Sequence, residues 1–77
     1  MSTERIMAMF RSPSSGKLYK AIEGPYPHLG IIMFKEKGGT DWRAGGRGYG
    51  PFGSPEDAEG VLRDKAQRFN WEEISND

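Results

Sequence analysis

One segment of the chain has the sequence of an amphipathic helix, and this segment constrains the fold more than any other. Ser54 stands at an N-cap position, Pro55 at the first helical position, and Glu56 and Asp57 in the first turn, where acids complement the helix dipole. Asn70 is a suitable stop. Between them, apolar or long-stemmed side chains recur at helical spacing: Ala58, Val61, Leu62, Lys65, Ala66 and Phe69. The pattern predicts one helix from Pro55 to Phe69.

The chain before this helix has the patterns of strands. Residues 5–11 and 17–23 alternate on either side of the turn at residues 12–16, which predicts a β-hairpin. The run Ile31–Phe34 is β-branched and aromatic and predicts a central strand, with a partner strand starting at residues 41–44. Glycines dominate beyond that, so we expect a loop or a broken strand there. Residues 71–74 form either a short final strand or an extended tail that packs Trp71 on the core.

These elements predict an α+β fold in one domain over residues 1–77, with polar tails at 1–4 and 75–77. The simplest architecture is a small antiparallel β-sheet of about four strands, with a fifth left open, and one C-terminal amphipathic helix packed on one face. In the first strand, Ile6, Ala8 and Phe10 are expected on one face. The predicted core consists of Leu18, Ile22, Ile31, Phe34, Val61, Leu62 and Phe69.

The chain has 77 residues, no cysteine and one histidine. Disulfides, a thiolate metal site and a multi-histidine site are therefore excluded for the chain alone, and an apolar core must supply the stability. No apolar run approaches the ~20 residues of a membrane span, and the first residues lack the pattern of a secretory signal. We expect a whole, cytoplasmic protein without membrane contact.

The formal net charge is zero, but the charges are unevenly distributed. Residues 1–53 carry eight basic and four acidic side chains, whereas residues 54–77 carry three basic and seven acidic ones. The sequence therefore predicts a basic sheet region and an acidic helical end. Such asymmetry can direct a protein towards a charged partner, although complementarity within the molecule accounts for it equally well.

No set of residues indicates catalysis, and we expect no enzyme. His28 lies in a predicted loop without a neighbouring nucleophile or carboxylate pair. The segment 48–53 matches the G-x-G-x-x-G pattern of dinucleotide sites, but the surrounding βαβ unit is missing. Glu56 and Asp57 also place negative charge where the pyrophosphate would bind. We therefore expect no cofactor and no metal ion.

Rings and arginines alternate in the segment 41–49, which is rich in glycine. Trp42 and Tyr49 interleave with Arg43 and Arg47, a pattern that suits single-stranded nucleic acid, where rings stack on bases and arginines contact phosphates. Residues 45–49 also look like one unit of an RGG-type RNA-binding segment. Lys35 and Lys37 would add charge. The alternative is a glycine-rich loop with Trp42 in the core, and the pI near 6.6 is low for a nucleic-acid-binding protein.

The C-terminal half shows a faint resemblance to a known family. Trp42-Arg-Ala-Gly45, Phe52, Ala58, Lys65 and Trp71 occur in the order in which similar residues occur in the WGR domain of some DNA-repair polymerases. The Trp-Gly-Arg triplet itself is absent. The resemblance covers about residues 42–71 and implies nucleic-acid binding.

Methionines at positions 7, 9 and 33, together with Tyr19, are predicted on the sheet face away from the helix. An adaptable apolar face of this kind suits a protein partner or a homodimer. The favoured hypothesis is a small non-enzymatic module that docks on a partner protein through its sheet and glycine-rich loop, as phage or bacterial accessory proteins and inhibitors do. The alternative is a nucleic-acid-binding domain. The candidate binding residues are Tyr19, Lys35, Lys37, Trp42, Arg43, Arg47 and Tyr49.

Overall fold

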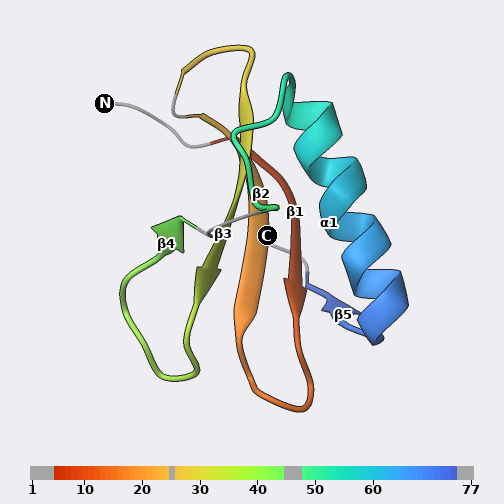
Figure 1. The fold of residues 1–77 in the computed structure, drawn as a ribbon. Helices are drawn as coiled ribbons and strands as arrows, with labels where there is room; N and C mark the ends of the chain where they lie inside the picture. The colour runs from red at the N-terminus through yellow and green to blue at the C-terminus, as the bar shows by residue number, and fades with distance from the viewer. Residues whose placement is uncertain (1–4, 25, 45–47, 75–77) are drawn as a thin grey trace.

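The computed structural model describes residues 5–24, 26–44 and 48–74 and shows a five-stranded antiparallel sheet with one helix packed on it (Figure 1). This confirms the predicted α+β architecture. The elements are, in chain order, β1 (Arg5–Arg11), β2 (Leu18–Glu23), β3 (Gly30–Lys35), β4 (Arg43–Ala44), α1 (Pro55–Phe69) and β5 (Glu72–Glu73).

The sheet has the strand order β4-β3-β2-β1-β5. The first four strands follow one another along the chain as a meander. The chain then crosses one face of the sheet as α1 and returns to the far edge, where β5 pairs with the end of β1: Glu73 lies opposite Phe10 and Glu72 opposite Arg11. Of the two alternatives predicted for residues 71–74, a short final strand or an extended tail, the structure therefore shows the strand.

The ends of α1 follow the predicted caps. The hydroxyl of Ser54 accepts a hydrogen bond from the amide of Asp57 at 3.0 Å, and Pro55 occupies the first turn. Asn70 adopts the left-handed conformation with φ 60°, and its amide donates to the carbonyl of Ala66. This conformation turns the chain sharply out of the helix, and the next amide, that of Trp71, also bonds to Ala66.

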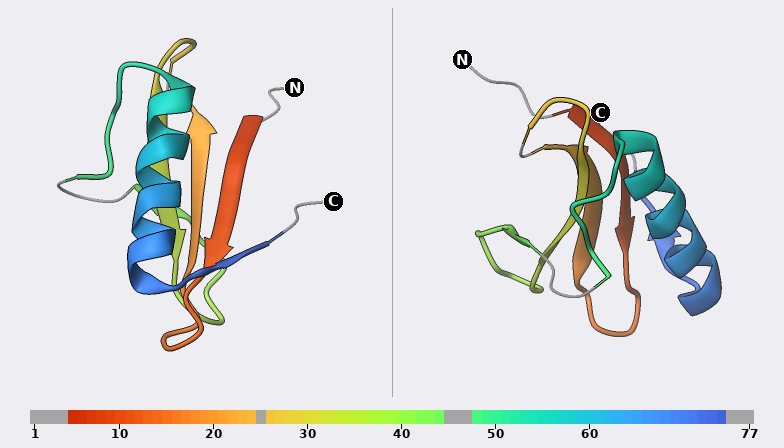
Figure 2. Two further views of the ribbon diagram at one scale, coloured as in Figure 1. Left: turned by 90° about the vertical axis from the view of Figure 1, so that its right-hand side faces the viewer. Right: turned by 45° about the horizontal axis from the view of Figure 1, so that its top comes forward.

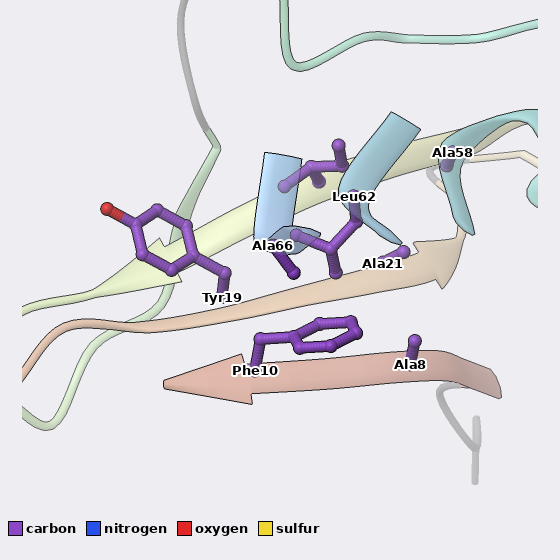
Figure 3. Packing of buried hydrophobic residues seen from close by; sticks show 8 residues of the cluster. Ala8, Phe10, Tyr19, Ala21, Ala58, Leu62 and Ala66 are labelled. Carbon is purple, nitrogen blue, oxygen red and sulfur yellow. The ribbon is translucent and has the colours of Figure 1, made fainter. Parts of the chain in front are cut away.

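The core lies between α1 and the three longest strands, β1, β2 and β3 (Figure 2, left; Figure 3). Small residues of the helix and of the sheet allow the two layers to approach closely. Ile32 and Leu62 are the largest fully buried side chains. The cluster consists of Ala8, Phe10, Tyr19, Ala21, Ile32, Ala58, Leu62 and Ala66.

A β-bulge in β1 corrects the predicted faces of this strand. Ile6 pairs with Ile22, but the next pair in register is Ala8 with Ala21, so Met7 is an extra residue between them. The bulge shifts the alternation by one residue. Ile6 consequently lies on the face away from α1, whereas Met7 packs against the core cluster.

The predicted core list is partly right and partly wrong, for the helix as well as for the sheet. Leu62 is fully buried, and Val61 and Phe34 pack against the core from its margin. Phe69 is 55% exposed at the end of α1. The remaining members, Leu18, Ile22 and Ile31, lie on the opposite sheet face, because α1 covers the alternate residues of β2 and β3.

The segment after β4 continues the edge of β3. The amide of Ile32 donates to the carbonyl of Tyr49 at 2.9 Å, and Gly30 and Phe52 exchange two hydrogen bonds. The prediction of a loop or broken strand in the glycine-rich stretch falls partly on residues 45–47, which lie outside the described residues. No helix in the described ranges is long and apolar enough to cross a membrane.

Candidate docking surface

The sheet face opposite α1, called the open face below, is defined by the cross-strand register. Side chains alternate between the two faces of a strand, and partners in neighbouring strands point to the same side. The rows that alternate with the core residues therefore make up the open face. From one end of the sheet to the other these rows are Ile6–Ile22–Ile31, Met9–Lys20–Met33–Ala44 and Glu72–Arg11–Leu18–Lys35.

The open face combines apolar side chains with positive charge. Its central row carries a lysine between two methionines, and its outer rows carry aliphatic residues and two further cations. Among its described residues the one carboxylate is that of Glu72, which pairs with Arg11 at the edge of the sheet. Ile22 and Lys20 are buried at its centre, and Met9, Met33 and Lys35 are half-buried around them.

Trp42 lies over the cationic part of the open face. The Nζ atom of Lys20 is 4.2 Å from the centroid of a Trp42 ring, and that of Lys35 is 5.2 Å away. Both distances are within the range of cation–π attraction. The segment that leads into β4 lies on the side of the sheet opposite α1, which brings the indole to this position (Figure 2, right). Trp42 is therefore a half-buried surface residue and does not belong to the core under α1.

The acidic residues of the C-terminal part lie mainly on the other side of the molecule. The exposed side of α1 carries Glu56, Asp57 and Asp64. Two of the helix acids form i,i+4 pairs, Glu59 with Arg63 at 2.9 Å and Asp64 with Arg68 at 3.2 Å. The charge asymmetry of the sequence thus becomes partly a spatial one: cations outnumber carboxylates on the open face, and the helix carries most of the described acidic residues of the C-terminal part.

The residues expected to bind nucleic acid do not come together. Arg43 pairs with Phe34, so its position belongs to the helix-covered face, whereas Trp42 lies on the open face. Tyr49 packs against the core, and Arg47 lies outside the described residues. Of the two lysines, Lys35 joins Trp42, but Lys37 lies in the following turn. The stem of Lys37 lies close to Gly16 of the β1–β2 turn.

Tyr19 is not on the exposed sheet face, and that prediction is wrong. Its side chain is buried on the helix-covered face, where its ring stacks on Trp71 with 4.1 Å between the ring centroids and 8° between the planes. Burial raises the pKa of the Tyr19 hydroxyl above its ordinary value of 10.0, and the neighbouring Tyr49 raises it further. The alternation of β2 was predicted correctly, but the choice of the buried face was not.

The Tyr19–Trp71 pair belongs to an aromatic row that the sequence analysis missed. Tyr49 makes edge contacts with Tyr19 and with Phe34, each at 6.5 Å between centroids. At the other end, Phe69 lies 5.6 Å from Trp71. Such pairs add stability beyond their buried area. The row packs against the core beside the C-terminal end of α1. These rings therefore have a structural role.

Among the described residues, small cavities lie at both ends of the sheet. One, of about 370 Å³, is lined by the serine-rich β1–β2 turn together with Arg11, Lys37 and Glu72. The other, of about 330 Å³, lies beside the start of α1 and includes Arg5, Glu23 and His28. Over the described ranges, no group of three or more histidine, cysteine or carboxylate residues is arranged to hold a metal ion.

Comparisons with protein-family models, curated proteins and solved structures found no match. The resemblance in residues 42–71 to WGR domains therefore receives no support from a family model. The candidate site rests on the geometry of the open face alone.

Proposed function

We propose that the protein is a small non-enzymatic module that docks on another protein through the open face. The observation that carries the proposal is the row Met9–Lys20–Met33, which places adaptable apolar side chains and a cation at the centre of a face that α1 leaves uncovered. Methionine adapts to differently shaped partners, and tryptophan is enriched where protein surfaces bind. Such a module would act by occupying its partner's surface, as an accessory or inhibitory protein.

Nucleic-acid binding is the weaker candidate. A single-stranded ligand needs rings that are free to stack and cations that follow its backbone. Trp42 already covers two lysines, Tyr49 packs against the core, and Arg43 occupies a position on the other face. The dispersal of these groups favours a protein partner.

The proposal is tested by capture with matched surface variants. Immobilised wild-type protein, Met33→Asp and Gln67→Asp are each incubated with a lysate of the source, and the captured proteins are quantified by mass spectrometry. Met33 lies on the open face, and Gln67 is an exposed residue of α1. A carboxylate at position 33 must be desolvated in the complex, so it should abolish capture, whereas Gln67→Asp should leave it unchanged.

Circular dichroism and urea unfolding of the three proteins control for loss of the fold. Capture of one protein by the wild type and Gln67→Asp, with its loss in a folded Met33→Asp, is the expected result. Equal capture by all three would contradict the use of the open face.

A further inference from the structure

We infer that the surface recognised by the open face is an acidic one, with carboxylates of a partner protein around an apolar centre. The inference rests on the proposed function and adds the chemistry of the partner. Its basis is the excess of positive charge on the open face, whose rows hold three cations and, among the described residues, one carboxylate, that of Glu72 opposite Arg11.

Lys35 is the principal contact for such a carboxylate. It lies at the end of the row Glu72–Arg11–Leu18–Lys35 and is only half-buried. Lys20 is more deeply buried, and the indole of Trp42 lies over it. Arg11 already pairs with Glu72. A carboxylate that approaches the open face therefore meets Lys35 first, beside the Trp42 ring.

The apolar centre of the partner follows from the neighbouring rows. Met33 is next to Lys20 across the sheet, and Ile31 and Ile22 continue the apolar surface beyond them. A ligand with charge alone would leave this area in water, whereas one with apolar groups flanked by carboxylates would cover both parts. Charge steers the encounter, and burial of the methionine and isoleucine side chains provides the affinity.

A second copy of this chain is a poorer occupant. Two open faces packed about a two-fold axis would place lysines of like charge in one interface, where repulsion opposes binding. The acidic side of α1 in another copy has the right charge, but binding of helix to sheet is a heterologous contact that would propagate into chains. Phosphates also carry negative charge, but they do not match the apolar rows.

The inference is tested by titration with synthetic peptides. In a Trp71→Phe background, the fluorescence of Trp42 alone reports events on the open face. The probes are a twelve-residue peptide of alternating glutamate and leucine, the same peptide with glutamine for glutamate, and a single-stranded oligonucleotide. Amide chemical shifts locate the binding site. Lys35→Gln is the test variant, and Lys65→Gln, whose ammonium group lies 5.4 Å from the Tyr49 ring, is the matched control.

We expect the glutamate peptide to bind at the open face, about five-fold more weakly in Lys35→Gln and unchanged in Lys65→Gln, with affinity falling as salt rises. Equal binding of the glutamine peptide would overturn the acidic partner and leave docking through the open face intact. Preferred binding of the oligonucleotide would overturn it in favour of nucleic acid. Absence of binding by any probe would also overturn it, while loss of capture in Met33→Asp would still report on docking itself.

Discussion

The ammonium group of Lys20 lies beneath the indole of Trp42, with its Nζ atom 4.2 Å from the ring centroid, and the lysine is only 5% exposed. A buried cation is costly unless its surroundings compensate for the lost water. The π face of an indole offers such compensation, and the lysine stem is itself apolar. The pair thus fixes a positive charge at the centre of the open face and holds the segment before β4 against the sheet.

The first prediction concerns the coupling within this pair. In a double-mutant cycle of Trp42→Leu and Lys20→Met, measured by urea unfolding, we expect a coupling free energy of about 0.5–2 kcal/mol. The parallel cycle of Trp42→Leu with Lys35→Met should give a smaller value, because Lys35 is less buried and lies 5.2 Å from the ring. Equal coupling in the two cycles would contradict a special role for the buried lysine.

A second prediction concerns the contact between β3 and the start of α1. A Cβ atom at Gly30 would lie 2.5 Å from the backbone oxygen of Ser54 and 2.7 Å from the Cβ atom of Ala58. Gly30→Ala should therefore force the helix away from the sheet and destabilise the fold by about 1–3 kcal/mol.

The matched control for this substitution is Gly60→Ala. Gly60 lies on the exposed side of α1, and a Cβ atom there would meet nothing within 4 Å. The substitution should stabilise the protein by about 1 kcal/mol through helix propensity. Urea unfolding of both variants measures the two effects. If Gly30→Ala proved as stable as the wild type, the close packing of helix on sheet would be wrong.

A third prediction concerns alkaline pH. Because the pKa of Tyr19 is raised in the folded state, its neutral form is favoured there. This contribution to the free energy of unfolding is fully present below the unfolded pKa of about 10 and is lost as the pH rises through the folded pKa. Tyr19→Phe should reduce the loss of stability above pH 10, whereas the same change at the exposed Tyr26 should not.

Urea unfolding at a series of pH values checks this result, with tyrosinate absorbance reporting ionisation. An alkaline decline of equal size in the wild type and in Tyr19→Phe would show that burial of Tyr19 is not its cause.

Local signals in the sequence predicted the helix well. The caps at Ser54 and Asn70 act through neighbouring backbone groups, so the residues themselves specify where α1 begins and ends. Strand positions were also readable from alternation. The side of the sheet that α1 covers could not be predicted in this way. Tyr19 and Leu18 are both apolar enough to be buried, and the choice between them depends on contacts between residues far apart in the chain.

The candidate surface was only partly predictable for the same reason. The bulge at Met7 exchanges the faces of β1 without a signal such as glycine at that position. The stack of Trp71 on Tyr19 depends on the left-handed turn at Asn70 and on the return of the tail to β1. Alternation did indicate Met9 and Met33 as residues of the face away from the helix, and the register confirms their positions.

The most direct measurement of docking through the open face is site-specific photo-crosslinking. A photoreactive phenylalanine analogue replaces Met33 in one protein and Gln67 in another, and each is irradiated in a lysate of the source. Docking through the open face predicts a discrete heavier adduct from position 33 and none from position 67. An adduct from position 67 alone, or none from position 33, would contradict it.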